Sequence, residues 1–173
     1  MAIEAIATFA NVERFMLQLF VDMMGGNRTI AASMFLALDS DAAKTRALNA
    51  AAEVAFIETP DVLRIFRAIL KIGKTNLLDR NKLVHWTWGD SDDIDDALLL
   101  MDPRKALDGA LDYDAIFVYK AVDFQRIIEA NDKLCGFCRT IQYVINGHVA
   151  NHDGRMLRRL LDDPLIGENI QDR

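Results

Sequence analysis

One stretch constrains the fold of this chain more than any other, the helical segment that begins after Thr59-Pro60 and reaches Trp86. Thr59 and Pro60 form a helix start signal, with Thr as N-cap and Pro at the first helical position. An ideal helix turns about 100° per residue. Six apolar or small residues therefore fall within roughly 60° of Arg80: Val62, Phe66, Ile69, Gly73, Leu77 and Val84. The sequence predicts a long amphipathic helix with a charged side chain on its apolar face.

Arg80 is the residue that makes this helix unusual. A guanidinium cannot lose its charge, so burying it without a partner is costly. Asn81 lies about 100° round the helix from Arg80, and His85 lies about 140° round. Asn81 and His85 are therefore one turn apart on the same side. The sequence therefore predicts that another group meets Arg80 at this end of the helix.

The residues Arg80-Asn81-x-x-x-His85 resemble the RNxxxH signature of the HEPN superfamily, the higher eukaryotes and prokaryotes nucleotide-binding domains. Members of that family are small helical bundles that often dimerise. Many are metal-independent ribonucleases whose Arg and His meet at the dimer interface. The resemblance implies an up-and-down helical bundle, a homodimer and an RNA substrate, with Arg80, Asn81 and His85 as catalytic residues. One departure is Trp86, which stands after His85 where many members carry a small residue.

The resemblance also implies a mechanism, which is RNA cleavage without a metal or another cofactor. His85 would transfer protons, Arg80 would hold phosphate oxygens, and Asn81 would position His85 or the phosphate by hydrogen bonds. Two chains at a two-fold axis would supply the two acid–base groups that the reaction needs. The expected products are a 2′,3′-cyclic phosphate and a 5′-hydroxyl. A role in a toxin or defence system, with an antitoxin as a further partner, is also implied.

The whole chain reads as one mainly helical domain over residues 1–173, because its length is that of a single domain. We predict an all-α bundle of about four to six helices with a small two-strand insertion. The helices are expected near residues 2–24, 28–38, 42–57, 60–86, 124–147 and 154–161, and the strands at Ala97–Met101 and 115–122. Asn27, Asp39-Ser40-Asp41 and Asp123 are the expected helix caps.

The first helix is expected to carry a second charge on a core face. Its main stripe contains Glu13, within roughly 20° of the centre. We therefore expect Glu13 to pair with Arg80, either as a structural salt bridge or as a support that orients Arg80. The second half of this helix is apolar almost all round, which favours burial against a second subunit over a central place in one chain.

Two charged features bear on nucleic-acid binding. A stripe of basic residues lies on the solvent side of the long helix, and its usual meaning is a solvated face, although it could also guide RNA past His85. Its members are Arg64, Arg67, Lys71, Lys74 and Lys82, and the acids Asp61 and Asp79 are expected elsewhere round the helix. The acidic loop 90–96 follows the site and would repel a phosphate backbone. The net charge of −6 argues against sequence-blind coating of nucleic acids.

Other patterns predict less chemistry. Cys135 and Cys138 match the spacing of half a zinc or redox site, but both lie on an apolar helical stripe, which favours core thiols. His148 and His152 are spaced for a metal, yet the chain offers no neighbouring glutamate as in HExxH, so we read them as surface residues. A metal or thiol protein built on these four residues is a third hypothesis. No secretory signal or membrane span is evident, so we expect a cytoplasmic protein.

The competing functional hypothesis is a non-catalytic HEPN-like module. In that interpretation Arg80 and Glu13 form a structural pair, and the apolar face of the first helix binds a partner chain or a second copy. The acidic total charge and the acidic loop favour it. RNA cleavage in the presence of a chelator separates the two hypotheses.

Overall fold

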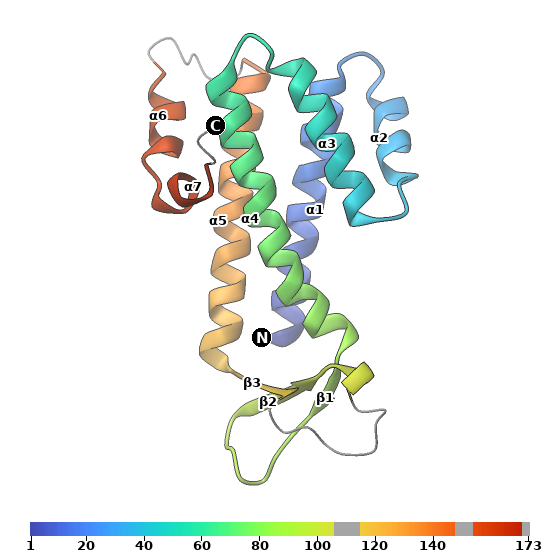
Figure 1. Cartoon of the computed structure of the whole chain (residues 1–173), viewed down its shortest axis with the longest axis vertical. Coiled ribbons are helices and arrows are strands. Elements are labelled where there is room, and N and C mark those ends of the chain that lie inside the picture. Colours follow the sequence, from blue (N-terminus) through green and yellow to red (C-terminus); the bar gives the residue numbers. More distant parts are fainter. Residues whose placement is uncertain (106–114, 148–153, 171–173) are drawn as a thin grey trace. The chain divides into compact units, whose positions relative to one another are not determined.

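The computed structural model describes residues 1–105, 115–147 and 154–170, and Figure 1 labels its helices and strands. The described part of the chain contains seven α-helices and one three-stranded antiparallel sheet, so the prediction of a mainly helical protein is confirmed. The helices are α1 (Ala2–Met24), α2 (Arg28–Leu36), α3 (Asp41–Ala55), α4 (Pro60–His85), α5 (Ala121–Ile145), α6 (Arg155–Leu161) and α7 (Pro164–Asn169). The strands are β1 (Thr87–Gly89), β2 (Ala97–Met101) and β3 (Ile116–Lys120), with a 3₁₀ turn at Pro103–Lys105.

Most helix starts follow from local chemistry in the sequence. The side chain of Asn27 accepts hydrogen bonds from the backbone N–H groups of Thr29 and Ile30, and so caps α2. Ser40 caps α3 in the same way through the N–H of Ala43. These two caps and the start of α4 at Pro60 were predicted correctly.

Three predictions about element boundaries were wrong. The insertion has three strands, because the chain enters β1 directly after α4. The segment after α6, for which no helix was predicted, forms α7 with Asp163 as its N-cap. Asp123 is not the N-cap of α5, since the helix begins at Ala121. Its carboxylate instead accepts a hydrogen bond from the backbone N–H of Lys120, as an acidic residue in the first turn can.

The chain divides into two compact units, each assembled from separate segments of sequence. The first unit contains Met1–Ala10 and Lys74–Asp132, and the second contains Asn11–Gly73 and Lys133–Arg173. The helices α1, α4 and α5 contribute residues to both units. The prediction of a single domain over residues 1–173 stays a prediction.

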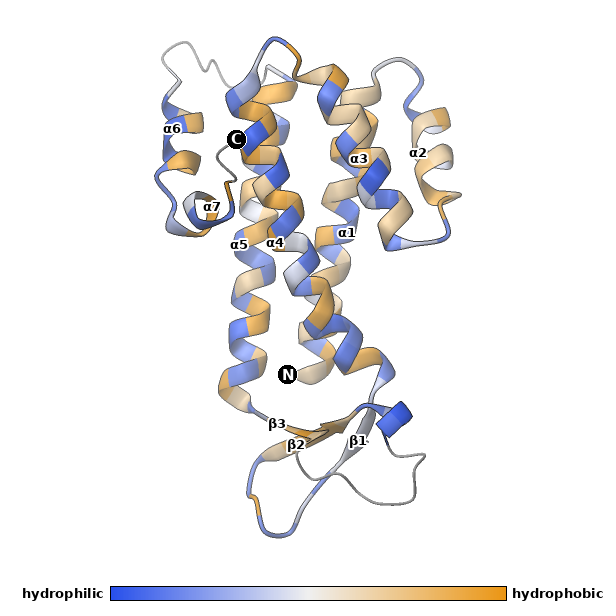
Figure 2. Ribbon diagram, in the orientation of Figure 1, coloured by the Kyte–Doolittle hydropathy of each residue, from blue (hydrophilic) through white to orange (hydrophobic). Residues whose placement is uncertain are grey.

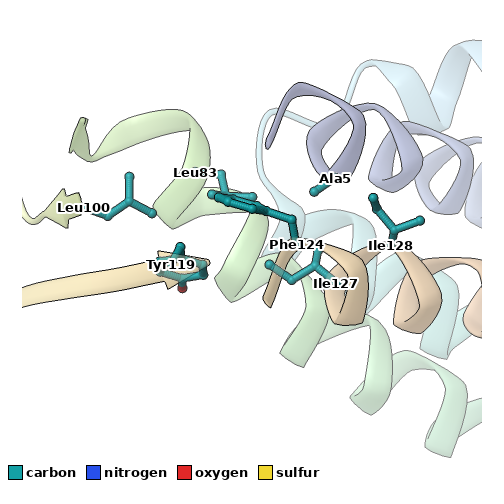
Figure 3. Packing of buried hydrophobic residues seen from close by; sticks show 7 residues of the cluster. All are labelled: Ala5, Leu83, Leu100, Tyr119, Phe124, Ile127 and Ile128. Atoms are coloured by element: carbon teal, nitrogen blue, oxygen red, sulfur yellow. The ribbon is translucent and has the colours of Figure 1, made fainter. Parts of the chain in front are cut away.

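The core of the first unit joins the sheet to the helix ends. Figure 3 shows its side chains pointing toward one another from α1, α4, β2, β3 and α5. The fully or nearly fully buried members are Ala5, Leu83, Leu100, Tyr119, Phe124, Ile127 and Ile128. Burying an aliphatic side chain of this size contributes about 1.5–3 kcal/mol. The cluster therefore fixes the last turns of α4 against the sheet.

The strand β2 is the centre of the sheet. It pairs antiparallel with β1 on one edge, where Trp88 is opposite Leu100, and with β3 on the other, where Leu100 is opposite Phe117. Residues directly opposite one another share a face of a sheet. Leu100 on this face is 0% exposed, whereas Trp88 and Phe117 on either side of it remain 43% and 44% exposed. The inner face of the sheet is thus buried at its centre, at Leu100, and partly exposed to solvent at Trp88 and Phe117 on the two edge strands.

The core of the second unit contains the apolar half of α1. Its buried residues are Val12, Phe15, Met16, Leu19, Phe20 and Val21. The chain itself covers them, so a second subunit is not needed to bury these residues, and a contact of this helix with a second subunit stays a prediction. Gly73 lies 3.4 Å, measured from an ideal Cβ, from the side chain of Met16 and 3.7 Å from that of Leu134. Side chains, and not another backbone, fill the space beside this glycine.

The helices are amphipathic, and Figure 2 shows hydrophilic and hydrophobic residues alternating along α4 and α5. The apolar stripe that the sequence predicted through Cys135 and Cys138 is buried, together with Phe124, Leu134 and Ile141 of α5. Within the described ranges, no helix has the length and apolar character that crossing a membrane requires.

Candidate functional site

The candidate site lies at the C-terminal end of α4, where the helix gives way to β1. Arg80 is half-buried, and its Nη1 donates a hydrogen bond to the Oδ1 of Asn81 at 3.0 Å. His85 is exposed and is the last residue of the helix. One turn of helix separates Asn81 from His85. The bond to Asn81 therefore draws the guanidinium round the helix toward the side on which His85 lies.

The sequence pattern predicted that Arg80 lies in the middle of the buried face of α4, and this prediction is wrong. In this part of α4 the buried residues are Leu83, which is 1% exposed, and Asn76, which is 9% exposed. Arg80 lies roughly 60° round the helix from Leu83, and Val84 beside it is 40% exposed. The guanidinium thus stands at the border of the buried face. It is partly shielded from water and can still be reached from outside.

Glu13 does not have the environment that was predicted for it. It is exposed on α1, while Val12 and Leu19 are 2% and 0% exposed. The helix is apolar on several sides in this region, and packing buries the line through Val12 and Leu19. Burial therefore gives no reason for Glu13 to pair with Arg80.

The end of α4 is anchored by an aromatic side chain. The indole Nε1 of Trp88 donates to the backbone carbonyl oxygen of Leu83 at 2.9 Å. The last carbonyl groups of a helix have no partner within the helix, so this bond caps the final turn. The cap fixes the backbone on both sides of His85.

Lys82 packs against two aromatic rings beside the same end of α4. Its Nζ lies 4.9 Å from the centroid of the Phe117 ring and 5.8 Å from that of Trp86, and the two rings contact each other at 5.2 Å. The same Nζ lies 3.7 Å from the carboxylate of Asp79. Sequence spacing could not predict this arrangement because Phe117 comes from a distant strand. Lys82 supports the fold here and is already neutralised.

The basic stripe of α4 is less available than the sequence suggested. Arg64 lies 3.6 Å from Asp61, and Arg67 lies 2.9 Å from Glu53. The expectation that Asp61 and Asp79 lie away from the stripe is wrong, because each forms an ion pair three residues along the helix. Lys71 and Lys74 are exposed. A role in binding RNA stays a prediction for all five residues of the stripe.

The acidic loop 90–96 begins at the far end of β1. A strand advances about 3.3 Å per residue, so the three residues of β1 carry the chain about 10 Å from the end of α4. Five aspartates occupy the loop, all of them exposed, and the Ser91 hydroxyl accepts a hydrogen bond from the N–H of Asp93. The repulsion between this loop and an RNA backbone is weakened by distance and by salt.

The cysteine pair has the character of a structural site. Cys135 and Cys138 are both buried and do not form a disulfide. Burial, with a smaller contribution from Cys135, raises the pKa of the Cys138 thiol well above its usual range. Since the thiolate is the form that reacts and binds metals, Cys138 is chemically silent. His148 and His152 lie outside the described residues.

A metal site or similarity to a known protein would also indicate a function. Across the described segments, no group of three or more His, Cys, Asp or Glu side chains is placed to hold a metal ion. Comparison with protein-family models, with curated proteins and with solved structures finds no match to this chain.

Proposed function

We propose that this protein is a HEPN-like, metal-independent endoribonuclease that acts as a homodimer. The observation that carries the proposal is the hydrogen bond from Arg80 to Asn81 at the accessible edge of α4, with His85 exposed one turn further on. The bond holds the guanidinium on the side of the imidazole. The mainly helical fold is compatible with the up-and-down bundle of that family.

The roles of the three residues follow from their chemistry. His85 accepts the proton of the ribose 2′-hydroxyl, whose oxygen then attacks the adjacent phosphorus. Arg80 has N–H donors besides the one directed at Asn81, and these stabilise the charge on the phosphorane oxygens. The partner subunit's His85 gives a proton to the leaving 5′-oxygen. The products are a 2′,3′-cyclic phosphate and a 5′-hydroxyl, so no water or metal is consumed.

A second copy is part of the proposal because one chain supplies one histidine at the site. Val84, beside Arg80, is 40% exposed, and Leu78 in the same helix is 57% exposed. Apolar side chains at these positions suit a contact between two copies. The proposal also includes a cytoplasmic location and a toxin or defence role in which an antitoxin restrains the enzyme.

The test is incubation of RNA with the purified protein in excess EDTA. Wild type is expected to produce fragments with cyclic phosphate ends, and Arg80→Ala, Asn81→Ala and His85→Ala are expected to lower the rate by about 10²–10⁴-fold. Arg46→Ala is the matched control, since Arg46 is exposed on α3. Cleavage that survives His85→Ala, or that EDTA abolishes, contradicts the proposal.

The alternative is a non-catalytic HEPN-like module, for which the sequence suggested the apolar face of α1 as the surface that binds a partner chain or a second copy. Because that face is buried, the exposed Val84 and Leu78 of α4 are the binding surface in this version of the alternative. The ion pairs of Arg64, Arg67 and Lys82 favour it, because they leave less positive charge for RNA. Its signature is a dimer or complex that Val84→Asp disrupts, in a protein that leaves RNA intact. Sedimentation analysis beside the cleavage assay distinguishes the two functions.

A further inference from the structure

We propose that Arg14 on α1 and Arg139 on α5 form a binding site for a phosphate group, separate from the candidate catalytic residues. Both arginines belong to the second compact unit. They are far apart in the sequence and follow no motif, so only the fold brings them together. The site rests on contacts that do not involve the proposed nuclease function.

The two guanidinium groups converge on one aromatic ring. The Cζ of Arg14 lies 5.2 Å from the centroid of the Phe15 ring, and the Cζ of Arg139 lies 5.5 Å from the same centroid. The two charges therefore cannot be farther apart than the sum of these distances. Phe15 is only 6% exposed, whereas both arginines are exposed. Attraction to the ring holds each guanidinium in place before any ligand arrives.

Both arginines lie on the same side of the helix pair. In this unit α1 and α5 run parallel, because Asp22 bonds to Gln142 while Phe15, earlier on α1, contacts Arg139. Arg14 lies about 80° round α1 from Asp22, and Arg139 about 60° round α5 from Gln142 in the opposite sense. When two parallel helices are viewed along their axes, rotations of opposite sense away from the line of contact lead to the same side of the helix pair. The guanidinium groups thus cover the same groove, with Phe15 beneath them.

The absence of an acidic partner in the described part of the chain sets this pair of arginines apart. Among the residues that the structure describes, neither Arg14 nor Arg139 has a carboxylate within ion-pair distance. Five other arginines do have such partners: Arg28, Arg64, Arg67, Arg104 and Arg126. Glu13 is next to Arg14 in sequence but projects about 100° away round the helix and is exposed. In a chain with 26 acidic and 20 basic residues, two neighbouring unneutralised arginines favour an external anion.

A phosphate group fits this pair better than a carboxylate does. Each guanidinium presents a planar fork of donors that matches two oxygens of an oxyanion. One fork satisfies a carboxylate, whereas a tetrahedral phosphate can meet two forks that approach from different helices. A phosphate monoester also carries about −1.5 to −2 charges near neutral pH, which matches two arginines. Gly136, one turn before Arg139, is exposed, and a Cβ built on it meets nothing within 4 Å, so the surface beside the site is open.

The test uses the full chain and inorganic phosphate, titrated against chloride at equal ionic strength. Phosphate is expected to raise the melting temperature, and calorimetry is expected to give one site. Arg14→Gln and Arg139→Gln should each weaken binding by about ten- to a hundred-fold. Arg14→Lys and Arg139→Lys keep the charge and remove the fork, so they should weaken it less. Arg46→Gln, which removes an exposed charge of α3, should bind as wild type does.

A parallel titration with a short single-stranded oligodeoxynucleotide identifies the source of the phosphate. Stronger binding of the oligonucleotide, lost in the two glutamine variants, means that a nucleic-acid backbone is the ligand. Stronger binding of inorganic phosphate means a small phosphate compound. The proposal is overturned if wild type binds neither probe, or if Arg46→Gln loses as much affinity as the site variants. His85→Ala should bind inorganic phosphate as wild type does, which separates this site from the proposed nuclease.

Discussion

The side-chain amide of Asn76 donates a hydrogen bond to the Oδ1 of Asn131 at 3.1 Å, where both residues are almost wholly buried. The amide of Asn131 in turn donates to the hydroxyl of Thr8 at 3.0 Å and to the carbonyl oxygen of Ala5 at 3.4 Å. This chain of bonds joins α1, α4 and α5 inside the first unit. Its members satisfy one another, so the network fixes the register of the three helices without an orphaned polar group.

We expect Asn131→Leu to lower the free energy of unfolding by about 2–4 kcal/mol. The substitution removes three hydrogen bonds and leaves the amide of Asn76 buried without an acceptor. Urea denaturation followed by circular dichroism measures the change. Asn49→Leu is the control, because its amide bonds only to the local carbonyl of Thr45 in α3. Equal losses in the two variants would show that the buried network contributes little.

Stability in acid should depend on Asp22. Its side chain is 0% exposed. Burial tends to raise its pKa, but hydrogen bonds from Gln142, Arg28 and Asn146 outweigh burial and lower the pKa overall. The stabilisation is present above the unfolded-state pKa of about 4 and is lost as the pH falls through the lowered folded-state value.

Asp22→Asn should therefore cost about 1–3 kcal/mol at neutral pH, because the new amide group confronts other donors. It should also remove part of the decline in stability below pH 4. Unfolding curves between pH 7 and pH 2 test both statements. Asp41→Asn, on an exposed residue of α3, should keep the pH dependence of wild type. A wild-type curve that stays flat to pH 2 contradicts the role of Asp22.

Trp88→Phe should loosen the end of α4. Phenylalanine retains much of the packing area but cannot donate to the carbonyl of Leu83. The loss is expected to be about 1 kcal/mol and to appear as faster amide hydrogen exchange near His85. Trp86→Phe provides the comparison, since the Trp86 side chain contacts Phe117 and Lys82 through its ring. Protection that falls equally in both variants would argue for packing alone.

Neither cysteine should react in the folded protein. Burial raises the pKa of Cys138, so the thiolate needed for attack on a disulfide reagent is scarce. A chromogenic disulfide reagent at pH 8 should label no thiol in native buffer and two thiols in urea. Native labelling at the rate of a small thiol would revive the thiol-based hypothesis.

The sequence predicted those parts of the fold that local chemistry determines. Asn27 and Ser40 are helix caps that predict α2 and α3, and Pro60 predicts the start of α4. The run Ala97–Met101 was recognised as a strand. The strand β1 was not predicted from the sequence. The segment Thr87-Trp88-Gly89 is too short to show the alternating pattern of a strand, and no helix-breaking residue separates it from α4. The last helix predicted from the sequence ended near residue 161, so α7 was missed, although Asp163-Pro164 is itself a cap followed by a first helical residue.

The candidate site was predicted in residue type but not in environment. Periodicity placed Arg80 and Glu13 at the centres of buried faces. The structure places Arg80 at a border and Glu13 in solvent. Both errors arise because each apolar stripe is wider than one row of residues, and the sequence does not show which row packs against the core. The contacts of Phe117 with Lys82 and of Arg139 with Phe15 depend on helices and strands meeting in space, and no spacing along the chain encodes them.

The central strand β2 has a consequence for how this protein must be handled. Its five residues, Ala97–Met101, are uncharged and apolar, and both of its edges are occupied by β1 and β3. If the sheet opens, a segment of this kind can pair with its counterpart in another molecule. Aspartates stand on both sides of it, at Asp95 and Asp96 before and Asp102 after. Acidic residues that flank an aggregation-prone strand repel other copies of that strand, so the aspartates beside β2 protect the protein against aggregation when the sheet opens.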